Sequence, residues 1–527
     1  MDANDRPVEP SPAVSTDPAA AGAPEAWATS VLGPTGDLPP EMFREAARAT
    51  ADVMADYLRD VERYPVLPRV RPGELRARLD GTPPEEPEPL GKILEDYRAS
   101  IEPNVTHWQH PGFLAYFASS GSAPGILAEM LMATVTANAM LWRTSPVATE
   151  LEGVVVDWLR DGLGLPAEYD GLLTDTASTS SLIALAAARE SARPGAAADG
   201  LAGGPPLRVY ASGEAHSSID KAAMTLGLGR AGVQRIPTDS EYRMDVAALE
   251  SAIAQDRAGR WQPCAIVSTI GTTGSTSVDP TARLADIAAR EGLWLHVDAA
   301  YAGAAALIPE SRPLFAGWER ADSIVVNPHK WLFTPLDCSL LLSRRMERLR
   351  ASFSLVPEYL RTVGESTSGR DYNEYQPQLG RRFRALKLWF LLRAFGLSGL
   401  RERVRWHQEA ALALAARVDA EPEAELLAPV PFSTICLRWR PERFCGRESE
   451  PAVAQALDDL NARLMDAVNA TGQVFLSHTR LSGRFVIRIA INHLRTEQRH
   501  LDTCWQLIVH HGRRLGVELE VSPAPSG

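Results

Sequence analysis

Short apolar runs that alternate with helical stretches constrain the fold of this chain most strongly. Four of these runs are LRVYASG, CAIVSTIGTT, LWLHVDAAYAG and SIVVNPHKW, which begin at Leu207, Cys264, Leu293 and Ser323. They are rich in Val, Ile and Leu, which is typical of strands buried on both faces. Strands that alternate with helices build a mostly parallel central sheet, so we predict an α/β fold.

The regions on either side of this pattern differ from it. Helical spacing of apolar residues marks 41–63, 90–101 and 383–416. Near the C-terminus, the strand-like runs FSTICLRWR and GRFVIRIAI stand among further helical patterns. We therefore divide the chain into a disordered tail (1–40), an N-terminal helical segment (41–121), a large domain (122–398) and a small α+β C-terminal domain (399–527).

Composition excludes several classes of protein. The 527 residues carry a formal net charge of −12, which argues against nucleic acid or an anionic membrane as the main partner. The five cysteines include no CxxC pair, so we expect neither a disulfide framework nor a metal site. No apolar stretch reaches the roughly 18 residues of a membrane span, and the N-terminus does not resemble a signal peptide. We expect a cytoplasmic protein.

Lys330 is the most distinctive single residue. It stands in the segment Asn327-Pro328-His329-Lys330-Trp331, just after an apolar run. Ligands bind at strand ends in α/β sheets, and a lysine desolvated by apolar neighbours such as Trp331 has a lowered pKa. Its neutral amine can then form a Schiff base. A solvated loop lysine is the commoner case, and that alternative stays open for Lys330 taken alone.

Asp298 is a carboxylate at the end of the preceding apolar run. It stands 32 residues before Lys330, which fits one strand–crossover–strand unit and would bring both residues to the same sheet edge. Pyridoxal 5′-phosphate (PLP) needs such a pair, because a carboxylate at its pyridine nitrogen keeps the ring protonated as an electron sink. Helix capping is the alternative role for Asp298.

Three further strand ends carry polar residues. Small hydroxyl residues at 174–181 open a helix whose N-terminus would bind a phosphate, although ordinary N-capping is locally the simpler explanation. The turn at 271–274 is a second Gly/Thr segment of this kind. His216 can stack on a flat cofactor or transfer a proton, although a lone histidine is more often structural. The joint order of these features favours a cofactor site.

Together these motifs resemble the group II PLP-dependent decarboxylases of fold type I. The resemblance is closest to the aromatic-L-amino-acid decarboxylases, which act on DOPA, tyrosine or tryptophan, and it runs from about residue 41 to residue 515. It implies a PLP fold type I enzyme with a helical N-terminal dimerisation segment. The matching segments are residues 105–108, 113–117, 144–146, 150–152, 296–303, 327–331 and 379–383.

The resemblance implies that PLP is the cofactor and gives roles to residues by position. Lys330 would carry PLP, Asp298 would hold the pyridine nitrogen, and Ala300 and His216 would lie on the faces of the ring. The remaining contacts, mainly to the phosphate, would come from Ala177, Ser178, Thr273, Asn327 and His329.

The resemblance also implies a mobile loop that closes over the substrate and reaches the active site of the partner subunit, in an obligate homodimer. The polar segment 361–378 matches this loop and Tyr372 matches its tyrosine. The helices at 41–63 and 90–101 would pack across the dimer. After CO2 leaves, Tyr372 and His216 would deliver the proton to Cα.

The same residues bear on two alternative functions, an aldehyde synthase and a catalytically silent protein. Related aldehyde synthases typically replace that tyrosine with phenylalanine, or the histidine with asparagine. Because Tyr372 and His216 both stand here, a simple decarboxylase is favoured over an aldehyde synthase. The full set with Lys330 and Asp298 also speaks against a catalytically silent binding protein of the same fold.

The expected substrate wall departs from the family pattern. It consists of Trp108, Phe117, Ala118, Ser119 and Met140. The family often has proline where Ala118 stands, and animal members usually have phenylalanine at the position of Met140. The wall remains aromatic and lacks Arg or Lys, which favours an aromatic substrate over an acidic one. Core packing is the alternative role for these residues, and a non-aromatic substrate stays open.

Overall fold

The computed structural model describes residues 26–518 except 34, 80 and 356–368. The chain divides into two compact units, with the boundary between Thr106 and His107. Each unit is described by itself. Because the boundary falls at 106, residues 107–121 of the expected N-terminal segment belong to the second unit.

The first unit is helical. Its main helices are α2 (Pro40–Asp60), α3 (Glu74–Arg78) and α4 (Leu90–Asp96), and a π-helical turn, Tyr97–Ile101, continues α4. These elements agree with the helices predicted at 41–63 and 90–101.

The expected disordered tail is wrong for its last part. Residues Ala26–Thr29 form a short helix, α1, in which Trp27 is buried. This helix packs closely on α4, since a Cβ atom on Gly91 would stand 2.8 Å from the Cβ atom of Ala28. The apolar surface of Trp27 therefore gives this part of the chain a folded position.

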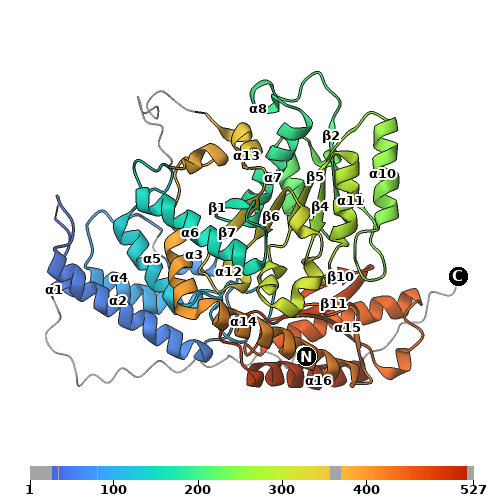
Figure 1. Ribbon diagram of the computed structural model, residues 1–527. Coiled ribbons are helices and arrows are strands. Elements are labelled where there is room, and N and C mark those ends of the chain that lie inside the picture. Colours follow the sequence, from blue (N-terminus) through green and yellow to red (C-terminus); the bar gives the residue numbers. More distant parts are fainter. Residues whose placement is uncertain (1–25, 34, 80, 356–368, 519–527) are drawn as a thin grey trace, which may run out of the picture. The chain divides into compact units, whose positions relative to one another are not determined.

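A seven-stranded sheet forms the centre of the second unit. Its strand order is β1-β7-β6-β5-β4-β2-β3 (Figure 1). The strands are β1 (Asp170–Thr174), β2 (Leu207–Ser212), β3 (Val233–Ile236), β4 (Gln262–Thr269), β5 (Trp294–Asp298), β6 (Ser323–Val326) and β7 (Ser339–Ser343). Only β7 runs antiparallel to its neighbours, β1 and β6, so the sheet is mostly parallel, as the alternating pattern predicts.

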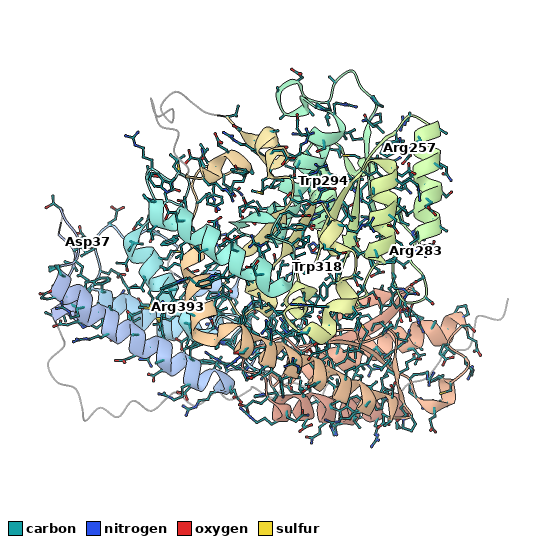
Figure 2. All side chains as sticks on the ribbon, viewed as in Figure 1. Asp37, Arg257, Arg283, Trp294, Trp318 and Arg393 are labelled. Carbon is teal, nitrogen blue, oxygen red and sulfur yellow. The ribbon has the colours of Figure 1, made fainter. Side chains whose placement is uncertain are left out.

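Helices cover both faces of this sheet, and successive strand residues point to opposite faces. Leu295 and Val297 of β5 belong to the hydrophobic cluster that contains α6, α10, α11 and the first part of α14. Trp294 belongs instead to the cluster that contains α7, α9 and α13. Figure 2 shows Trp294 inside the unit and Arg257 of α10 at its edge.

The helices of the second unit have the following bounds: α5 (Ala123–Val135), α6 (Pro146–Leu163), α7 (Ala177–Ala192), α8 (Ala196–Asp199), α9 (Ser218–Thr225), α10 (Val246–Ala258), α11 (Thr281–Glu291), α12 (Pro328–Trp331), α13 (Met346–Phe353), α14 (Arg384–Asp419), α15 (Pro451–Ala470) and α16 (Gln498–Glu518). Helix α14 is interrupted at Gly396, whose φ of 63° breaks the helical backbone. None of the described helices is long and apolar enough to cross a membrane.

A smaller antiparallel sheet follows, in the order β10-β11-β9-β8. Its strands are β8 (Ala424–Leu426), β9 (Thr434–Trp439), β10 (Ser477–Leu481) and β11 (Arg484–Ala490). Helices α15 and α16 pack with it around a separate hydrophobic cluster. This is the α+β arrangement predicted for the C-terminal part.

The segment before α5 is bound to this small sheet. Phe113 forms a parallel bridge with Phe475, and the N–H of Ala490 donates to the carbonyl of Leu114 at 2.8 Å. The side chain of Asn492 accepts from the N–H of Ala118 at 3.1 Å and donates to its carbonyl at 2.9 Å. The expected substrate wall is therefore positioned by residues more than 350 positions later in the chain.

A buried ion pair joins the segments beside β1. Arg381 donates to Oε1 of Glu152 at 2.6 Å and to the carbonyls of Ala139 and Leu173 at 2.7 and 2.9 Å. The same Glu152 oxygen accepts from the N–H of Leu173 at 2.8 Å. Both charged side chains are 1% exposed, so neither has water as an alternative partner.

We predict that Arg381→Ala destabilises the fold strongly, because it leaves the Glu152 carboxylate buried without its cation. Breaking a buried pair in this way costs about 3–5 kcal/mol. Arg382→Ala is the matched control, since Arg382 is half exposed and pairs with Glu129 at the surface, where such a pair contributes about 0–1 kcal/mol. Urea midpoints of the two variants should differ clearly, and equal midpoints would contradict the prediction.

Candidate active site

Lys330 and Asp298 lie at the ends of two neighbouring strands. Strand β5 ends at Asp298, and β6 is followed by Asn327 and then by α12, which contains Lys330. The strands pair in parallel, with Asp298 opposite Val325. The N–H of Asn327 donates to the carbonyl of Ala300 at 3.0 Å, so the two loops beyond the strands are also joined. Asp298 and Lys330 therefore lie at the same edge of the sheet, as the interval of 32 residues predicts.

The surroundings of Lys330 favour its neutral amine. Burial lowers its pKa first, the nearby Arg488 lowers it further, and the carboxylate of Asp298 raises it. Nζ lies 5.4 Å from the centre of the Phe117 ring. A desolvated, partly neutral lysine is a nucleophile for a carbonyl compound.

One oxygen of the Asp298 carboxylate accepts a hydrogen bond from the protein backbone. Oδ1 accepts from the N–H of Ala300 at 3.0 Å, and the side chain is buried. Within the described residues, Oδ2 has no hydrogen-bond donor. A buried carboxylate with one available oxygen can accept an N–H from a ligand, such as a protonated ring nitrogen.

His216 is oriented by the start of α9. Its Nδ1 accepts from the N–H of Ser218 at 3.2 Å and lies 2.9 Å from the Ser218 hydroxyl. The pKa of His216 is lowered, first by desolvation and then by Lys330, while Asp298 raises it. A neutral imidazole that accepts at Nδ1 carries its proton at Nε2, and that N–H is left for a ligand.

The first turn of α7 presents amide groups of the kind that bind phosphate. Thr176, the N-cap residue, makes no side-chain capping bond, and Ser178 is exposed. The first N–H groups of a helix have no partner inside it, so they remain available to an anion. Thr273 is also exposed, in a turn where Gly271 has a φ of 87° and where a Cβ atom would stand 2.6 Å from Ala302.

Asn327 and His329 flank the start of α12. Oδ1 of Asn327 is buried and has no hydrogen-bond partner. His329 accepts at Nδ1 from the N–H of Cys338 at 3.0 Å, and burial lowers its pKa to about 3. His329 is therefore neutral with its proton at Nε2, so both side chains keep a polar atom for a ligand.

A column of aromatic rings supports the wall beside Lys330. Phe117 stacks on Tyr301 with ring centres 3.6 Å apart, and Tyr301 stacks on Trp331 at 4.8 Å. The Trp331 indole donates to Nδ1 of His407 at 3.0 Å. The neighbour of Lys330 in sequence thus positions the ring that faces Lys330 in space.

The other expected wall residues do not all meet at Phe117. Trp108 stacks on Phe113 at 4.3 Å in a separate aromatic cluster, and it is partly exposed. Ala118 is buried and Ser119 is partly exposed beside Phe117 in the chain. Met140 accepts with its carbonyl from the N–H of Asn373 at 3.3 Å. Among the described residues, Phe117 is the member of the expected wall that lies against Lys330.

Arg488 is a site residue that the sequence reasoning missed. It is buried in β11, and its guanidinium carbon lies 4.4 Å from the centre of the Phe117 ring. It donates to the carbonyls of Gly274, at 3.2 Å, and Tyr116, while Nη2 has no partner. The signal that could have identified it is an arginine inside the strand-like run GRFVIRIAI, because a charged side chain in a buried strand needs a partner.

Tyr372 is a correction to the sequence-based prediction. Its ring is 1% exposed and packs beneath the Arg381 guanidinium, whose carbon lies 4.5 Å from the ring centre. It belongs to the hydrophobic cluster on the α7 face of the large sheet. A side chain buried in its own subunit cannot reach the active site of a partner, so Tyr372 does not fit the loop tyrosine.

Part of the expected loop has no described structure. Residues 361–368 lie outside the described residues, whereas 369–378 are described and contain Tyr372 and the partly buried Tyr375. Tyr359, just before the expected loop, also lies outside the described residues. It is the remaining tyrosine between β7 and α14.

The described residues contain no group of His, Cys, Asp and Glu that could hold a metal ion. The arrangement is instead an organic cofactor site: a desolvated lysine, a buried carboxylate, a neutral histidine and a helix N-terminus at one edge of a mostly parallel sheet. These are the donor types that an aldehyde, a pyridine nitrogen, a ring face and a phosphate require.

Comparison with known proteins agrees with this arrangement. The family model "Pyridoxal-dependent decarboxylase conserved domain" matches residues 72–440. Tyrosine decarboxylase 3 of Petroselinum crispum is 40% identical over 92% of this chain and 95% of its own length. Phenylacetaldehyde synthase of Arabidopsis thaliana is 38% identical over 89% and 95% of the two chains.

Solved structures agree as well. The crystal structure of Oryza sativa TDC with PLP and tryptamine has a TM-score of 0.87 and 36% identity, over 91% of this chain and 99% of that one. The chain belongs to the pyridoxal-dependent decarboxylase family. It is a PLP-dependent amino-acid decarboxylase, and PLP is its cofactor.

We predict that Arg488→Gln raises the pKa of Lys330, because it removes a buried positive charge that disfavours the ammonium form. Neutral Lys330 captures PLP, so the pH profile of capture by the apoenzyme should move to higher pH. The rate at which the visible cofactor band appears, followed from about pH 6 to pH 10, measures this shift. Lys330→Ala is the control, which should show no cofactor band. A pH profile that stays unchanged or moves to lower pH in Arg488→Gln contradicts the prediction.

Proposed function

We propose that this enzyme decarboxylates an aromatic L-amino acid, namely tryptophan, tyrosine, phenylalanine or DOPA, to the corresponding amine and CO2. The observation that carries the proposal is the placement of Lys330 near Asp298 and 5.4 Å from the centre of the Phe117 ring, over which Arg488 also lies. The relatives support it, since they include tyrosine and tryptophan decarboxylases.

Lys330, Asp298, Ala300 and His216 would hold the cofactor ring. Lys330 would bind the aldehyde, Asp298 would accept the pyridine N–H with Oδ2, and Ala300 and His216 would contact the two faces. When bound, PLP supplies a sink for the electron pair that remains at Cα after CO2 leaves. The fit rests on the available Asp298 oxygen and on the neutral imidazole.

Ala177, Ser178, Thr273, Asn327 and His329 would hold the phosphate end. The free amides of the first turn of α7 and the Ser178 and Thr273 hydroxyls would donate to the phosphate. The Nε2–H of His329 is a further donor, because its Nδ1 is already occupied by Cys338. The amide of Asn327 would turn its N–H2 group toward the same acceptors.

Arg488 would bind the α-carboxylate of the substrate. Every amino-acid substrate brings this group into the site, and the unpartnered Nη2 of Arg488 is a donor for it. The Phe117 ring lies near Lys330 and Arg488 and is stacked on Tyr301, so the wall beside the lysine is aromatic. An aromatic ring fits such a surface better than a second carboxylate, which would need its own cation.

An aldehyde synthase is the second candidate, because a phenylacetaldehyde synthase is among the relatives at 38% identity. Tyr372 no longer decides between the two reactions, since it is buried in the core. His216 still favours the decarboxylase. Its Nε2–H can hold a proton for Cα.

A homodimer with a shared active site remains a prediction. Support comes from Leu127, Leu131 and Val135, which are exposed along one stripe of α5, and from Val147, Val154 and Trp158 of α6. Exposed apolar surface of this extent is typical of a protein–protein interface. Packing of the N-terminal helices across that interface also remains a prediction.

Incubation of the PLP-loaded enzyme with each of the twenty L-amino acids tests the proposed substrate class. DOPA is tested in addition to the twenty. We expect amine and CO2 from one or more of tryptophan, tyrosine, phenylalanine and DOPA, and little product from glutamate or aspartate. Mass spectrometry identifies the amine. Turnover of an acidic or a small aliphatic amino acid alone would exclude the aromatic assignment.

We predict that Tyr372→Phe leaves the ratio of amine to aldehyde unchanged, because the hydroxyl of a core tyrosine does not meet the substrate. Tyr359→Phe is the matched variant: we propose that Tyr359 takes the role of the loop tyrosine, so its loss should slow amine formation and raise aldehyde release. Separate quantification of amine, aldehyde and hydrogen peroxide measures the partition. A shift toward aldehyde in Tyr372→Phe with none in Tyr359→Phe would restore the original assignment of Tyr372.

A further inference from the structure

A pocket of about 420 Å³ lies at the opposite edge of the large sheet from Lys330. Strands β5 and β6 begin there, with Trp294 and Ser323, and end at the active site. The antiparallel strand β7 ends there, and the next residues, Arg344 and Arg345, line the pocket. Its occupant therefore does not meet the substrate or PLP.

Four arginines surround the pocket: Arg320, Arg344, Arg345 and Arg348. Two carboxylates accompany them. Asp322 is buried and lies 3.4 Å from Arg345 and 3.8 Å from Arg344, and Asp286 pairs with Arg320 at 2.7 Å. The group keeps a net charge of two positive, although the whole chain has a net charge of −12. Such a concentration of one sign attracts anions.

Asp322 is already engaged as a structural group. Its Oδ2 accepts from the N–H of Leu295 at 2.9 Å, and its carbonyl accepts from the Ser343 hydroxyl at 2.7 Å. Only Oδ1 faces the arginines, at distances longer than a normal hydrogen bond. The carboxylate therefore orients Arg344 and Arg345 and leaves most of their N–H donors available.

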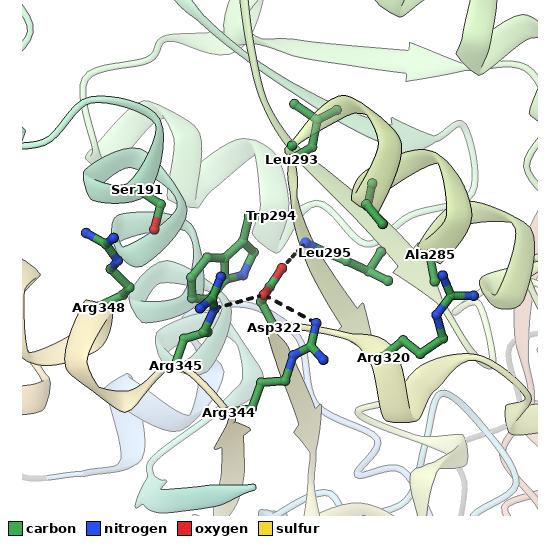
Figure 3. Close-up of a pocket in the computed structure, with 13 residues that line it drawn as sticks. Ser191, Ala285, Leu293, Trp294, Leu295, Arg320, Asp322, Arg344, Arg345 and Arg348 are labelled. Atoms are coloured by element: carbon green, nitrogen blue, oxygen red, sulfur yellow. Dashed lines mark hydrogen bonds and ion pairs between the residues drawn. The ribbon is translucent and has the colours of Figure 1, made fainter. Parts of the chain in front are cut away.

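Two further polar groups lack partners. Among the described residues Arg348 has no side-chain hydrogen bond or ion pair, and the Ser191 hydroxyl is buried without a partner. Figure 3 shows both at one end of the pocket, with Arg320 and Ala285 at the other and Asp322 between them. A buried, unsatisfied hydroxyl beside an unpaired guanidinium marks a place where a ligand oxygen would bind.

One wall of the pocket is apolar. Helix α11 contributes Ala285, Ala288 and Ala289, and Leu293 and Trp294 continue this surface. The small alanine side chains leave space for a flat or compact organic group next to the arginines. The pocket thus combines donors for a doubly charged anion with a surface for an apolar body.

We propose that this pocket binds a small organic phosphate. Guanidinium groups from different backbone positions match the several oxygens of a phosphate, which accept paired hydrogen bonds from arginine. A net charge of two positive complements a dianion, and donors gathered in one pocket match three oxygens on one phosphorus better than two separate carboxylates. The apolar wall selects a phosphate ester over the free ion.

Calorimetric titration of the holoenzyme tests the proposal. PLP is first fixed to Lys330 by borohydride reduction, so that added phosphate compounds cannot displace it. ADP and pyrophosphate are the probes, and succinate is the carboxylate control. We expect saturable binding of ADP, weaker binding of pyrophosphate and none of succinate. Bound ADP should also raise the thermal midpoint of unfolding by roughly 2 °C at saturating concentration.

Variants locate the binding. Arg348→Ala should weaken ADP at least about tenfold, and Arg348→Lys should recover part of the loss, since it keeps the charge without the planar fork. Arg230→Ala is the matched control, because Arg230 is an exposed arginine on the same unit that makes no ion pair with the described residues, and this variant should bind as the wild type does. Absence of ADP binding, equal binding of succinate, or full binding by Arg348→Ala would each overturn the proposal.

Discussion

The parallel pairing of β5 with β6 is the constraint on which the rest of the active site depends. It brings Asp298 and Lys330, which are 32 residues apart in the sequence, to one edge of the sheet. The loops beyond both strands are then tied by the hydrogen bond from Asn327 to Ala300. The neighbouring strand β4 adds the Gly271 turn to the same edge. A slip of one residue in this register would turn the side chains to the opposite faces and separate the lysine from the carboxylate.

Desolvation then sets the chemistry of the groups that this register brings together. Burial lowers the pKa of Lys330 and of His216, and it lowers that of His329 to about 3. Each of these bases is thereby held in, or moved toward, its neutral form, which is the form that attacks a carbonyl or donates from a single ring nitrogen. Arg488 acts in the same direction on Lys330, and its own unpartnered Nη2 remains for a carboxylate. One buried environment thus produces both the nucleophile and the anion site.

Much of the fold followed from local patterns, and the exceptions have physical reasons. The four apolar runs became β2, β4, β5 and β6 because buried parallel strands need uninterrupted Val, Ile and Leu. The sequence analysis does not predict strand β7. A run such as SLLLS does not indicate that the strand lies antiparallel between β1 and β6. The resemblance implies a loop tyrosine at Tyr372 from its place before the segment 379–382, in a polar stretch. The polar neighbours Arg370 and Asp371 are instead bound to Asp170 and Trp142.

The sequence by itself determined the α/β class, the lysine–aspartate interval and the order of polar residues at the strand ends, because each of these is encoded by neighbouring residues. Only the tertiary structure decided that Arg488 joins Phe117 and Lys330, that the wall segment at Phe113 is bound to β11 and Phe475, and that four arginines gather at the far end of β5 and β6. These contacts join residues far apart in the chain, or bring Arg320 into one pocket with the later arginines Arg344, Arg345 and Arg348. Tertiary packing selects such partners, since no local sequence pattern distinguishes an arginine that packs on an aromatic ring from one that is solvated.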